Sequence, residues 1–356
     1  MTGTPSLDEP GQPRSSEIIS DEVLKETLRV AVPDRYEGGP VALKQFAGGA
    51  SNLTYLVSFG EHELILRRPP FGTKAKSAHD MGREFRVLTA LQPYYPYCPK
   101  PVAEGDETSP LGVPFYLMER IRGVILRRDF EQPISPDAAR ALAFELMDKH
   151  IALHAIDTAG TKLADLGKPQ GYVRRQIEGW SERYRRAVTD DAPNADQVMA
   201  WLTQSMPAES GKASVIHNDY KFDNVIFDAE DGKRIVGVLD WEMATLGDPL
   251  MDLGASLAYW VEPGDPDVFQ MARLVPTNAP GMPSRAEIID YYSEKSGLTL
   301  NDPRFYFVYG LFRLAVVAQQ LYYRYAKGQT DNPKFAHFKP VVTGLLDMCL
   351  TQMEKA

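Results

Sequence analysis

Cysteine, long apolar runs and excess positive charge are all scarce in this chain of 356 residues. Cys98 and Cys349 are too few for a disulfide framework or a cysteine-based metal site, so we expect a reducing, cytoplasmic environment. No run of about 18 apolar residues occurs, which argues against a membrane span. The formal net charge of −9 argues against a nucleic-acid partner. An acidic chain can still bind small anions in a local basic pocket.

The first 35 residues separate into two parts. Residues 1–20 are polar, rich in Pro, Ser and Gly, and lack the basic start and apolar core of a signal peptide. This composition predicts a disordered leader, because it offers little apolar surface to bury. A first helix is expected to complete residues 1–35.

Residues 36–118 have the pattern of a β-rich lobe. Four apolar residues share one parity in SNLTYLVSFGEHELILRRPP, namely Leu53, Tyr55, Val57 and Phe59. This alternation predicts a hairpin that turns at residues 59–62. Residues 79–92 carry apolar side chains at helical spacing, and residues 114–121 predict a further strand.

From Ser135 onward the pattern becomes mostly helical. Ser135 followed by Pro136 is typical of a helix start. The exception is a β-like segment at residues 215–240. We therefore predict an α+β fold with a small antiparallel β-rich N-terminal lobe and a larger, mainly helical C-terminal lobe of residues 119–356.

The β-like segment contains polar side chains where apolar strands end. In SVIHNDYKFDNVIF, Asp219 and Asn224 lie between two apolar runs, and Asp240 follows the run IVGVL. Strand ends can make side chains both well positioned and accessible. Oxygen ligands of this kind suit a hard cation such as Mg²⁺. The three residues could therefore supply one base and two metal ligands.

The order His217-x-Asp219-x-x-x-x-Asn224, followed by Asp240, resembles the catalytic loop and metal-binding Asp of the protein-kinase-like fold. It is most similar to the aminoglycoside phosphotransferase family. LDWEMATLGDPLMDLG and GKPQGYVRRQIEGWSERY resemble the subgroup related to the phosphotransferase domain found alongside acyl-CoA dehydrogenases. The resemblance covers residues 36–330 and implies a bilobal fold, ATP and Mg²⁺ as cofactors, and transfer of the γ-phosphate to a hydroxyl of a small molecule.

The resemblance also implies residue roles. Asp219 would accept or orient the proton of the substrate hydroxyl, while Asn224 and Asp240 would hold Mg²⁺. Three residues would support the site structurally: His217, Asp248 and Asp252. In the nucleotide-binding lobe, Arg67 occupies the place of the usual lysine, with Glu84 as its ion-pair partner. The full set of expected cofactor-binding residues is Gly48, Gly49, Ser51, Asn52, Ile65, Arg67, Glu84, Met118, Glu119 and Ile121.

Less specific interpretations exist for several of these residues. Arg67 could end a strand at the surface, and Glu84 could be an exposed helix charge. His150 and His154 lie one helical turn apart, which suggests a metal pair, but the sequence offers no third ligand nearby. Packing is therefore the favoured interpretation for the two histidines.

The charges of three side chains predict the chemical class of the acceptor substrate. Arg174, Arg175 and Arg313 lie in segments that resemble the acceptor site and suit a carboxylate or phosphate, which favours a hydroxy acid or a hydroxyacyl-CoA. These arginines could instead pair with local acids such as Glu178 or Glu182. Alternative functions are an aminoglycoside 3'-type phosphotransferase, a choline- or homoserine-type kinase, and a non-catalytic nucleotide-binding module. A protein kinase is disfavoured, because DWE replaces Asp-Phe-Gly and no Ala-Pro-Glu follows. A monomer or a homodimer is expected.

Overall fold

The computed structural model describes residues 8–46, 52–71, 80–330 and 332–355. These residues form two compact units. The N-terminal unit comprises the described residues up to Ile125 together with Val225–Met243. The C-terminal unit comprises Leu126–Asn224 and the described residues from Ala244 onward.

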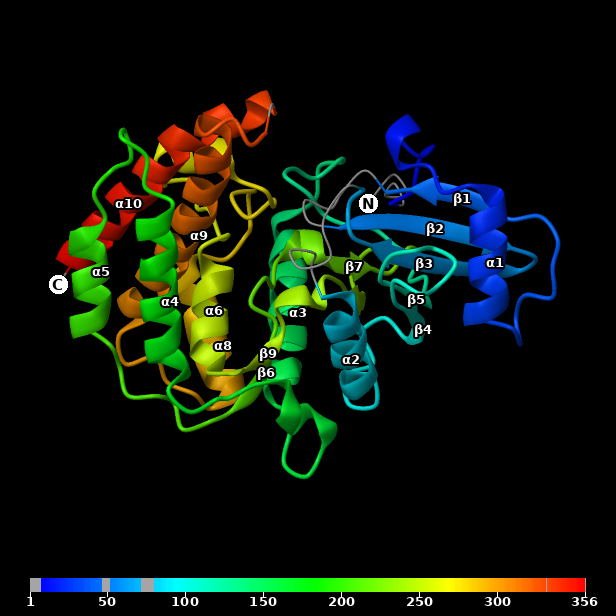
Figure 1. Cartoon of the computed structure of the whole chain (residues 1–356). Coiled ribbons are helices and arrows are strands. Elements are labelled where there is room, and N and C mark those ends of the chain that lie inside the picture. Colours follow the sequence, from blue (N-terminus) through cyan, green and yellow to red (C-terminus); the bar gives the residue numbers. More distant parts are fainter. Residues whose placement is uncertain (1–7, 47–51, 72–79, 331, 356) are drawn as a thin grey trace. The chain divides into compact units, whose positions relative to one another are not determined.

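An antiparallel sheet of five strands, in the order β1-β2-β3-β5-β4, forms the framework of the N-terminal unit (Figure 1). The strands are β1 (Ala42–Gln45), β2 (Leu53–Phe59), β3 (His62–Arg68), β4 (Pro101–Gly105) and β5 (Phe115–Glu119). The predicted β2–β3 hairpin is confirmed, and Gly60 adopts φ 54° in its turn. This is the left-handed region, which glycine enters without a Cβ penalty.

Two α-helices accompany this sheet, α1 (Asp21–Ala31) and α2 (Met81–Leu91), and both were expected from the sequence. Asp80 caps α2 by accepting a hydrogen bond from Arg83 N at 2.8 Å. The buried face of α2 includes Glu84 among its apolar residues. A charge on the buried face requires a partner there, and the sheet provides one.

The prediction of a disordered leader is wrong for residues 8–20. Gly11 and Gln45 exchange backbone hydrogen bonds of 2.9 and 2.8 Å, so this segment pairs with β1. Glu17, in the short 3₁₀ helix η1 (Ser15–Glu17), accepts a hydrogen bond from Tyr55 Oη at 2.8 Å through its carbonyl. Ordering this segment costs conformational entropy, and its polar composition offers little burial to offset that cost. The contacts with the sheet supply the stabilisation instead. Residues 1–7 lie outside the described residues.

Residues 225–243 belong to the N-terminal unit, although the sequence prediction placed them in the C-terminal lobe. They contain β7 (Val225–Phe227), β8 (Ile235–Val238) and the 3₁₀ helix η5 (Trp241–Met243). Phe227 and Val124 exchange backbone hydrogen bonds of 2.8 and 2.9 Å, and Val238 N donates to Tyr97 O at 2.7 Å. These long-range pairs were not readable from local sequence patterns.

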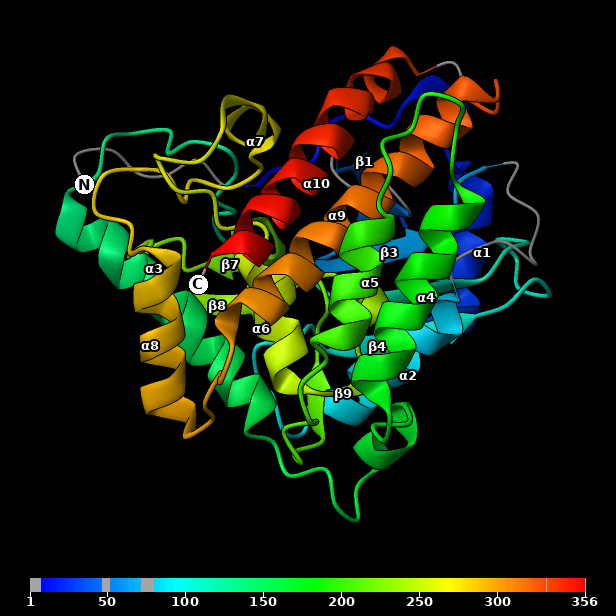
Figure 2. The same ribbon diagram turned by 90° about the vertical axis from the view of Figure 1, so that its left-hand side faces the viewer.

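Helices make up most of the C-terminal unit, as predicted. Figures 1 and 2 show α3 (Pro136–His154), α4 (Tyr172–Arg186), α5 (Asp196–Gln204), α6 (Pro249–Leu257), α7 (Asp267–Ala272), α8 (Arg285–Ser296), α9 (Pro303–Ala326) and α10 (Phe338–Glu354). Figure 2 shows α9 and α10 running side by side. Three short 3₁₀ helices also occur, η3 (Lys162–Leu166), η4 (Phe222–Asn224) and η6 (Pro333–His337). The predicted cap of α3 is confirmed, since Ser135 Oγ accepts from Ala138 N at 3.2 Å.

The close packing of α6 against α9 fixes the position of α6, the helix that carries Asp252. A Cβ built on Gly254 would lie 2.5 Å from Tyr306 O, so a larger side chain could not be accommodated without moving a helix. Two short strands, β6 (Ser214–Ile216) and β9 (Thr245–Gly247), pair beside these helices. Among the described residues, no helix combines the length and apolar character needed to cross a membrane.

Candidate active site

The segment His217–Asn224, named the catalytic loop after its predicted role, runs from the end of β6 through η4 and has a strained backbone. Asn218 has φ 65°, and Asp240 after β8 has φ 66°; among the described residues these are the non-glycine positions with positive φ. Such conformations are costly for residues with a Cβ and often occur at functional sites. Asn218 is held by the hydrogen bond that its Oδ1 accepts from Tyr172 Oη at 3.0 Å.

Asp252, on α6, fixes the backbone of the catalytic loop. Its Oδ2 accepts from His217 N at 2.7 Å, and its Oδ1 accepts from Asn218 N at 2.6 Å. Oδ2 also lies 3.0 Å from Nε2 of both His150 and His154. Burial disfavours the carboxylate, but the two histidines outweigh it and hold the pKa of Asp252 well below its usual value.

The histidine pair of α3 therefore does have a third group beside it, contrary to the sequence expectation. That group is Asp252, which lies 102 residues from His150 along the chain. All three side chains are buried. Their favoured role as packed core residues becomes more specific, because the pair completes the hydrogen bonding of a buried carboxylate.

Asp219 lies at the centre of a group of donors. Tyr259 Oη donates to its Oδ1 at 2.7 Å, and Lys221 Nζ donates to its Oδ2 at 2.5 Å. Burial opposes ionisation, but the charges of Lys221 and Arg313 prevail and lower the pKa of Asp219. The group therefore stays ionised at neutral pH. Asp219 N donates to His217 Nδ1 at 3.2 Å, which is a hydrogen bond within the loop.

Asn224 uses its side-chain nitrogen to hold Asp219. Nδ2 donates to Asp219 O at 2.8 Å and to Asp219 Oδ2 at 2.9 Å. Among the described residues, Asn224 Oδ1 receives no hydrogen bond. The amide is thus oriented with its oxygen available as a ligand, which is the orientation that a hard cation requires.

Asp248 also supports this part of the C-terminal unit. Its Oδ1 accepts from Leu250 N at 2.9 Å at the start of α6, and its Oδ2 accepts from Ser210 N at 2.8 Å. The first bond caps the helix that carries Asp252, and the second holds the segment that leads into β6.

Arg67 on β3 contacts two carboxylates of the N-terminal unit. Its Nη1 lies 2.7 Å from Glu84 Oε1, and its Nη2 lies 3.3 Å from Asp240 Oδ1. The predicted Arg67–Glu84 ion pair is confirmed, and both side chains are buried, so the surface interpretations are wrong. Burial raises the pKa of Glu84 to about 7, while Arg67 opposes this rise. The Asp240 carboxylate remains partly exposed and can accept further ligands.

Asn52 is engaged within the protein. Its Nδ2 donates to Glu242 Oε2 at 3.0 Å, while Arg83 Nη1 donates to Glu242 O at 2.6 Å. Asn52 therefore ties the start of β2 to the segment that follows Asp240. The three other predicted residues of this turn, Gly48, Gly49 and Ser51, lie outside the described residues.

The remaining residues predicted to contact nucleotide lie on β3, on β5 and just after β5. Ile65 faces Met118 across the β3–β5 pair, and both are buried. Glu119 N donates to Lys100 O at 2.9 Å, so this amide serves the sheet. Ile121 packs against Gly237, where a Cβ would lie 3.0 Å from Ile121 Cδ1.

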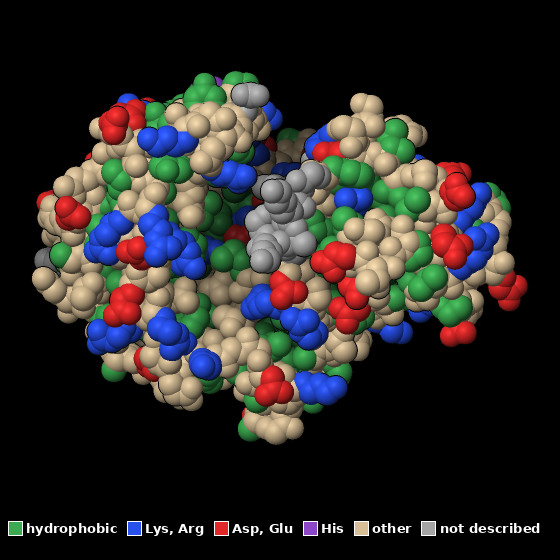
Figure 3. Space-filling view, viewed as in Figure 1, with side chains coloured by type: hydrophobic (Ala, Val, Ile, Leu, Met, Phe, Trp, Pro, Cys, Tyr) green, Lys and Arg blue, Asp and Glu red, His purple; other side chains and the backbone are tan. Residues whose placement is uncertain are grey.

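The three arginines predicted for the acceptor have different environments. Figure 3 shows Lys and Arg side chains gathered over α4, the helix that carries Arg174 and Arg175. Arg174 lies 4.0 Å from Glu178, and Arg175 donates to the carbonyls of Lys168 and Gln170. The contact of Arg174 agrees with the alternative of pairing with a local acid, whereas Arg175 contacts backbone carbonyls instead. Arg313 is buried on α9, where it lowers the pKa of Asp219.

Sequence reasoning missed Tyr259, which donates to Asp219 from 40 residues further along the chain. Its context, SLAYWV, is apolar and indicates only a core position. Lys221 was left uncertain, although a lysine between two acids in a short loop was a usable signal. It contacts both of them, at 2.5 Å from Asp219 and 3.4 Å from Asp223.

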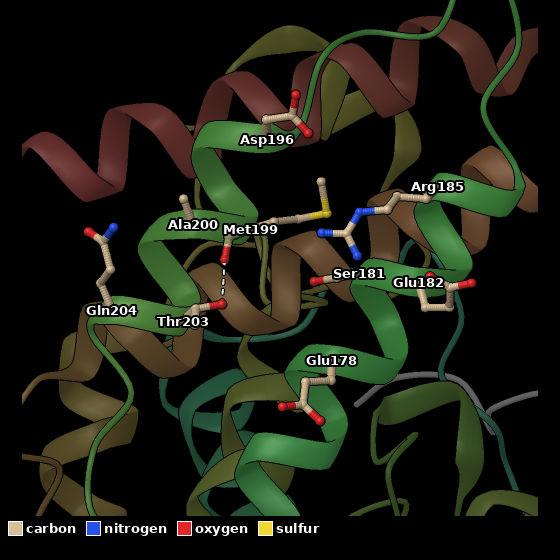
Figure 4. A pocket seen from close by; sticks show the side chains of 9 residues that line it. All are labelled: Glu178, Ser181, Glu182, Arg185, Asp196, Met199, Ala200, Thr203 and Gln204. Carbon is tan, nitrogen blue, oxygen red and sulfur yellow. Dashed lines mark hydrogen bonds between the residues drawn. The ribbon is translucent and has the colours of Figure 1, made fainter.

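A cavity of about 630 Å³ opens between α4 and α5 (Figure 4). It is lined by Glu178, Ser181, Glu182, Arg185, Asp196, Met199, Ala200, Thr203 and Gln204. None of these residues belongs to the predicted site. This cavity is therefore distinct from the arrangement around Asp219.

A five-stranded antiparallel sheet accompanied by α2, followed by a helical unit with the loop order Asp219, Asn224 and then Asp240, is the architecture of the protein-kinase-like fold. The chain belongs to the phosphotransferase enzyme family, whose model matches residues 42–287.

Individual proteins agree with this assignment. The chain is 31% identical to mouse acyl-CoA dehydrogenase family member 10 over 90% of its own length, and spans 30% of that relative. A Ralstonia eutropha protein assigned to the aminoglycoside phosphotransferases is 29% identical, with a TM-score of 0.79 over 95% of this chain and 99% of the other. A thermostable aminoglycoside phosphotransferase mutant, solved with AMP-PNP and hygromycin B, is 16% identical, with a TM-score of 0.59 over 94% and 99% of the two chains.

Proposed function

We propose that the chain is an ATP- and Mg²⁺-dependent phosphotransferase that moves the γ-phosphate to a hydroxyl of a small molecule. The observation that carries the proposal is the arrangement around Asp219. An ionised carboxylate is held by Asn224 Nδ2 and Tyr259 Oη, while Asn224 Oδ1 remains available as a ligand. The family membership and the AMP-PNP complex of a protein with the same fold support this assignment.

In this proposal Asp219 orients the acceptor hydroxyl and takes its proton late in the reaction. Its lowered pKa makes it a weak base. Phosphoryl transfer through a loose transition state needs positioning more than early proton removal, so a weak base is sufficient. Tyr259 and Lys221 keep the Asp219 carboxylate oriented. The partial exposure of this carboxylate leaves room for the hydroxyl of the substrate.

Asn224 and Asp240 would hold Mg²⁺ through oxygen atoms, and the donor set fits that ion. When bound, the ion neutralises charge on the nucleotide phosphates. Arg67 would add a fixed positive charge to the nucleotide-binding unit. Its ion pairs with Glu84 and Asp240 orient the guanidinium group. Ile65, Met118, Glu119 and Ile121 remain the proposed adenine-side residues.

For the acceptor, we propose a hydroxy acid or a hydroxyacyl-CoA. Arg313 is buried close enough to Asp219 to lower its pKa, so a positive charge lies near the proposed base. The relative named as an acyl-CoA dehydrogenase family member favours acyl-CoA chemistry. The second candidate is an aminoglycoside, which the Ralstonia protein favours. Higher kcat/KM for hydroxyacyl compounds than for aminoglycosides, choline or homoserine would support the first candidate.

Asp219→Asn tests the mechanism. We expect Mg-ATP-dependent phosphorylation to fall by about 10²–10⁴-fold, because the side chain no longer accepts the hydroxyl proton. Asp223→Asn is the matched control, since Asp223 lies in the same loop and contacts the same Lys221, and its loss should be much smaller. Undiminished turnover in Asp219→Asn would contradict the mechanism. Nucleotide binding without turnover in the wild-type chain would favour the non-catalytic module.

A further inference from the structure

We propose that His150 is a positioning residue that fixes the catalytic loop through two contacts, one to Asp252 and one to Tyr220. The role assumes the proposed function, in which Asp219 must be held in place for an acceptor hydroxyl. His150 lies on α3, is fully buried, and does not itself contact Asp219. It acts through the residues on both sides of Asp219 in the sequence.

The first contact is polar. His150 Nε2 lies 3.0 Å from Asp252 Oδ2, and the same carboxylate accepts the backbone N–H groups of His217 and Asn218. These two residues immediately precede Asp219. A buried carboxylate that loses one donor reorganises its remaining hydrogen bonds, so the loop backbone depends on His150.

The second contact is aromatic. The ring of His150 stacks on Tyr220 with centroids 4.1 Å apart and planes at 13°, and Tyr220 immediately follows Asp219. Tyr220 Oη also donates to Leu146 O at 2.9 Å, one turn earlier on α3. Its own carbonyl accepts from Ser256 Oγ at 2.8 Å. The Tyr220 side chain is thus held against α3 by the hydrogen bond to Leu146 O and by stacking on the His150 ring.

His154 provides a comparison within the same helix. Its Nε2 lies 3.0 Å from the same Asp252 Oδ2, and its Nδ1 lies 2.7 Å from Tyr292 Oη. Tyr292 belongs to α8, outside the catalytic loop. The two histidines therefore share one contact and differ in the other, which isolates the contact with Tyr220.

Hydrogen bonding explains this cluster better than a bound metal. Asp252 Oδ2 already accepts a backbone N–H at 2.7 Å, and Oδ1 accepts another at 2.6 Å. Donation from Nε2 of both histidines completes this pattern, and Tyr292 Oη can then donate to His154 Nδ1. A structural zinc site would in addition need a fourth ligand.

Three variants of the full chain separate the contacts. His150→Phe keeps a ring against Tyr220 and removes the donor to Asp252, whereas His150→Gln keeps a side-chain N–H and removes the ring. His154→Gln is the matched control, because it keeps an N–H for the same oxygen and leaves the stacked pair of His150 and Tyr220 in place. The probe is Mg-ATP with water as acceptor, so that the acceptor need not be known.

We expect both His150 variants to lower kcat about tenfold, with KM for Mg-ATP within about twofold of wild type. His154→Gln should lower kcat less than about threefold. Amide hydrogen exchange in residues 217–224, measured well below each melting temperature, should be about tenfold faster in the His150 variants than in His154→Gln. A general loss of stability would affect all three variants and would not single out the loop.

Wild-type kcat and unchanged loop exchange in the His150 variants would overturn the proposal. Stoichiometric zinc in the purified wild-type chain, lost in His150→Gln, would overturn it as well, because the cluster would then be a metal site. If the wild-type chain turns over no Mg-ATP, the proposed function fails instead. The exchange comparison still decides about His150: faster exchange confined to the loop supports positioning, and equal exchange rejects it.

Discussion

At the residue scale, two carboxylates of the C-terminal unit, Asp252 and Asp219, differ in how far their surroundings leave them exposed. The Asp252 side chain has no exposed surface, and four donors satisfy it. The Asp219 side chain keeps 19% of its surface exposed, and its donors include the side chains of Lys221 and Tyr259. A sealed carboxylate can organise a backbone, whereas a partly open one can accept a substrate proton.

Tyr259→Phe tests the donors around Asp219. The variant removes the 2.7 Å hydrogen bond to Oδ1 and retains the packed ring next to Lys221. We expect kcat to fall about tenfold, because the carboxylate loses one of the groups that orient it. KM for Mg-ATP and the melting temperature should change little. A kcat equal to wild type would remove Tyr259 from the site.

Arg67→Lys tests the arginine that replaces the usual lysine. Its two nitrogens contact Glu84 and Asp240, and a single ammonium group on a shorter side chain cannot reproduce this geometry. We expect the free energy of unfolding in urea to fall by about 1–3 kcal/mol, because one ammonium group cannot keep the charge-assisted hydrogen bonds of both buried Glu84 and Asp240. In the Glu84→Gln background the same substitution should cost less. Equal losses in both backgrounds would show that the pair is not coupled.

At the element scale, local patterns were predictable and distant pairings were not. Parity and the turn at Gly60 identified the β2–β3 hairpin, because every signal lies within one short segment. The same sequence gave no sign that α3 and α6 meet at His150 and Asp252. Helical spacing shows which side of α3 is buried, but the partner on α6 depends on how the chain folds back.

Buried His154 of α3 predicts acid sensitivity. Burial, assisted by the charge of His150, lowers the pKa of His154 to about 4. A histidine with a lowered folded-state pKa contributes stability that is complete above the unfolded pKa of about 6.5 and is lost as pH falls towards 4. Between about pH 7 and pH 5, wild type should therefore lose about 2 kcal/mol more than His154→Gln. Urea unfolding at the two pH values measures this difference, and parallel losses would contradict it.

At the scale of the whole molecule, the resemblance predicted the two-lobe fold. The sequence alone did not show that a segment late in the chain belongs to the N-terminal unit. Residues 225–243 return to the N-terminal unit, so Asn224 ends a segment of one unit and Asp240 belongs to the other. The polar composition of residues 8–20 likewise concealed their pairing with β1. Composition reports the capacity of a segment to bury surface, whereas its partners are set by tertiary pairing.

Ligand-dependent stability tests the proposed metal ligands across the whole chain. At about 100 times its Kd, Mg-ATP should stabilise the folded chain by about 2.7 kcal/mol, which corresponds to a melting-temperature rise of roughly 4 °C. In Asp240→Asn, adding Mg²⁺ to ATP should raise the melting temperature little beyond ATP alone, because a charged oxygen ligand is lost. ATP with EDTA is the control and should act equally on both proteins. An undiminished Mg²⁺-dependent rise in the variant would exclude Asp240 as a metal ligand.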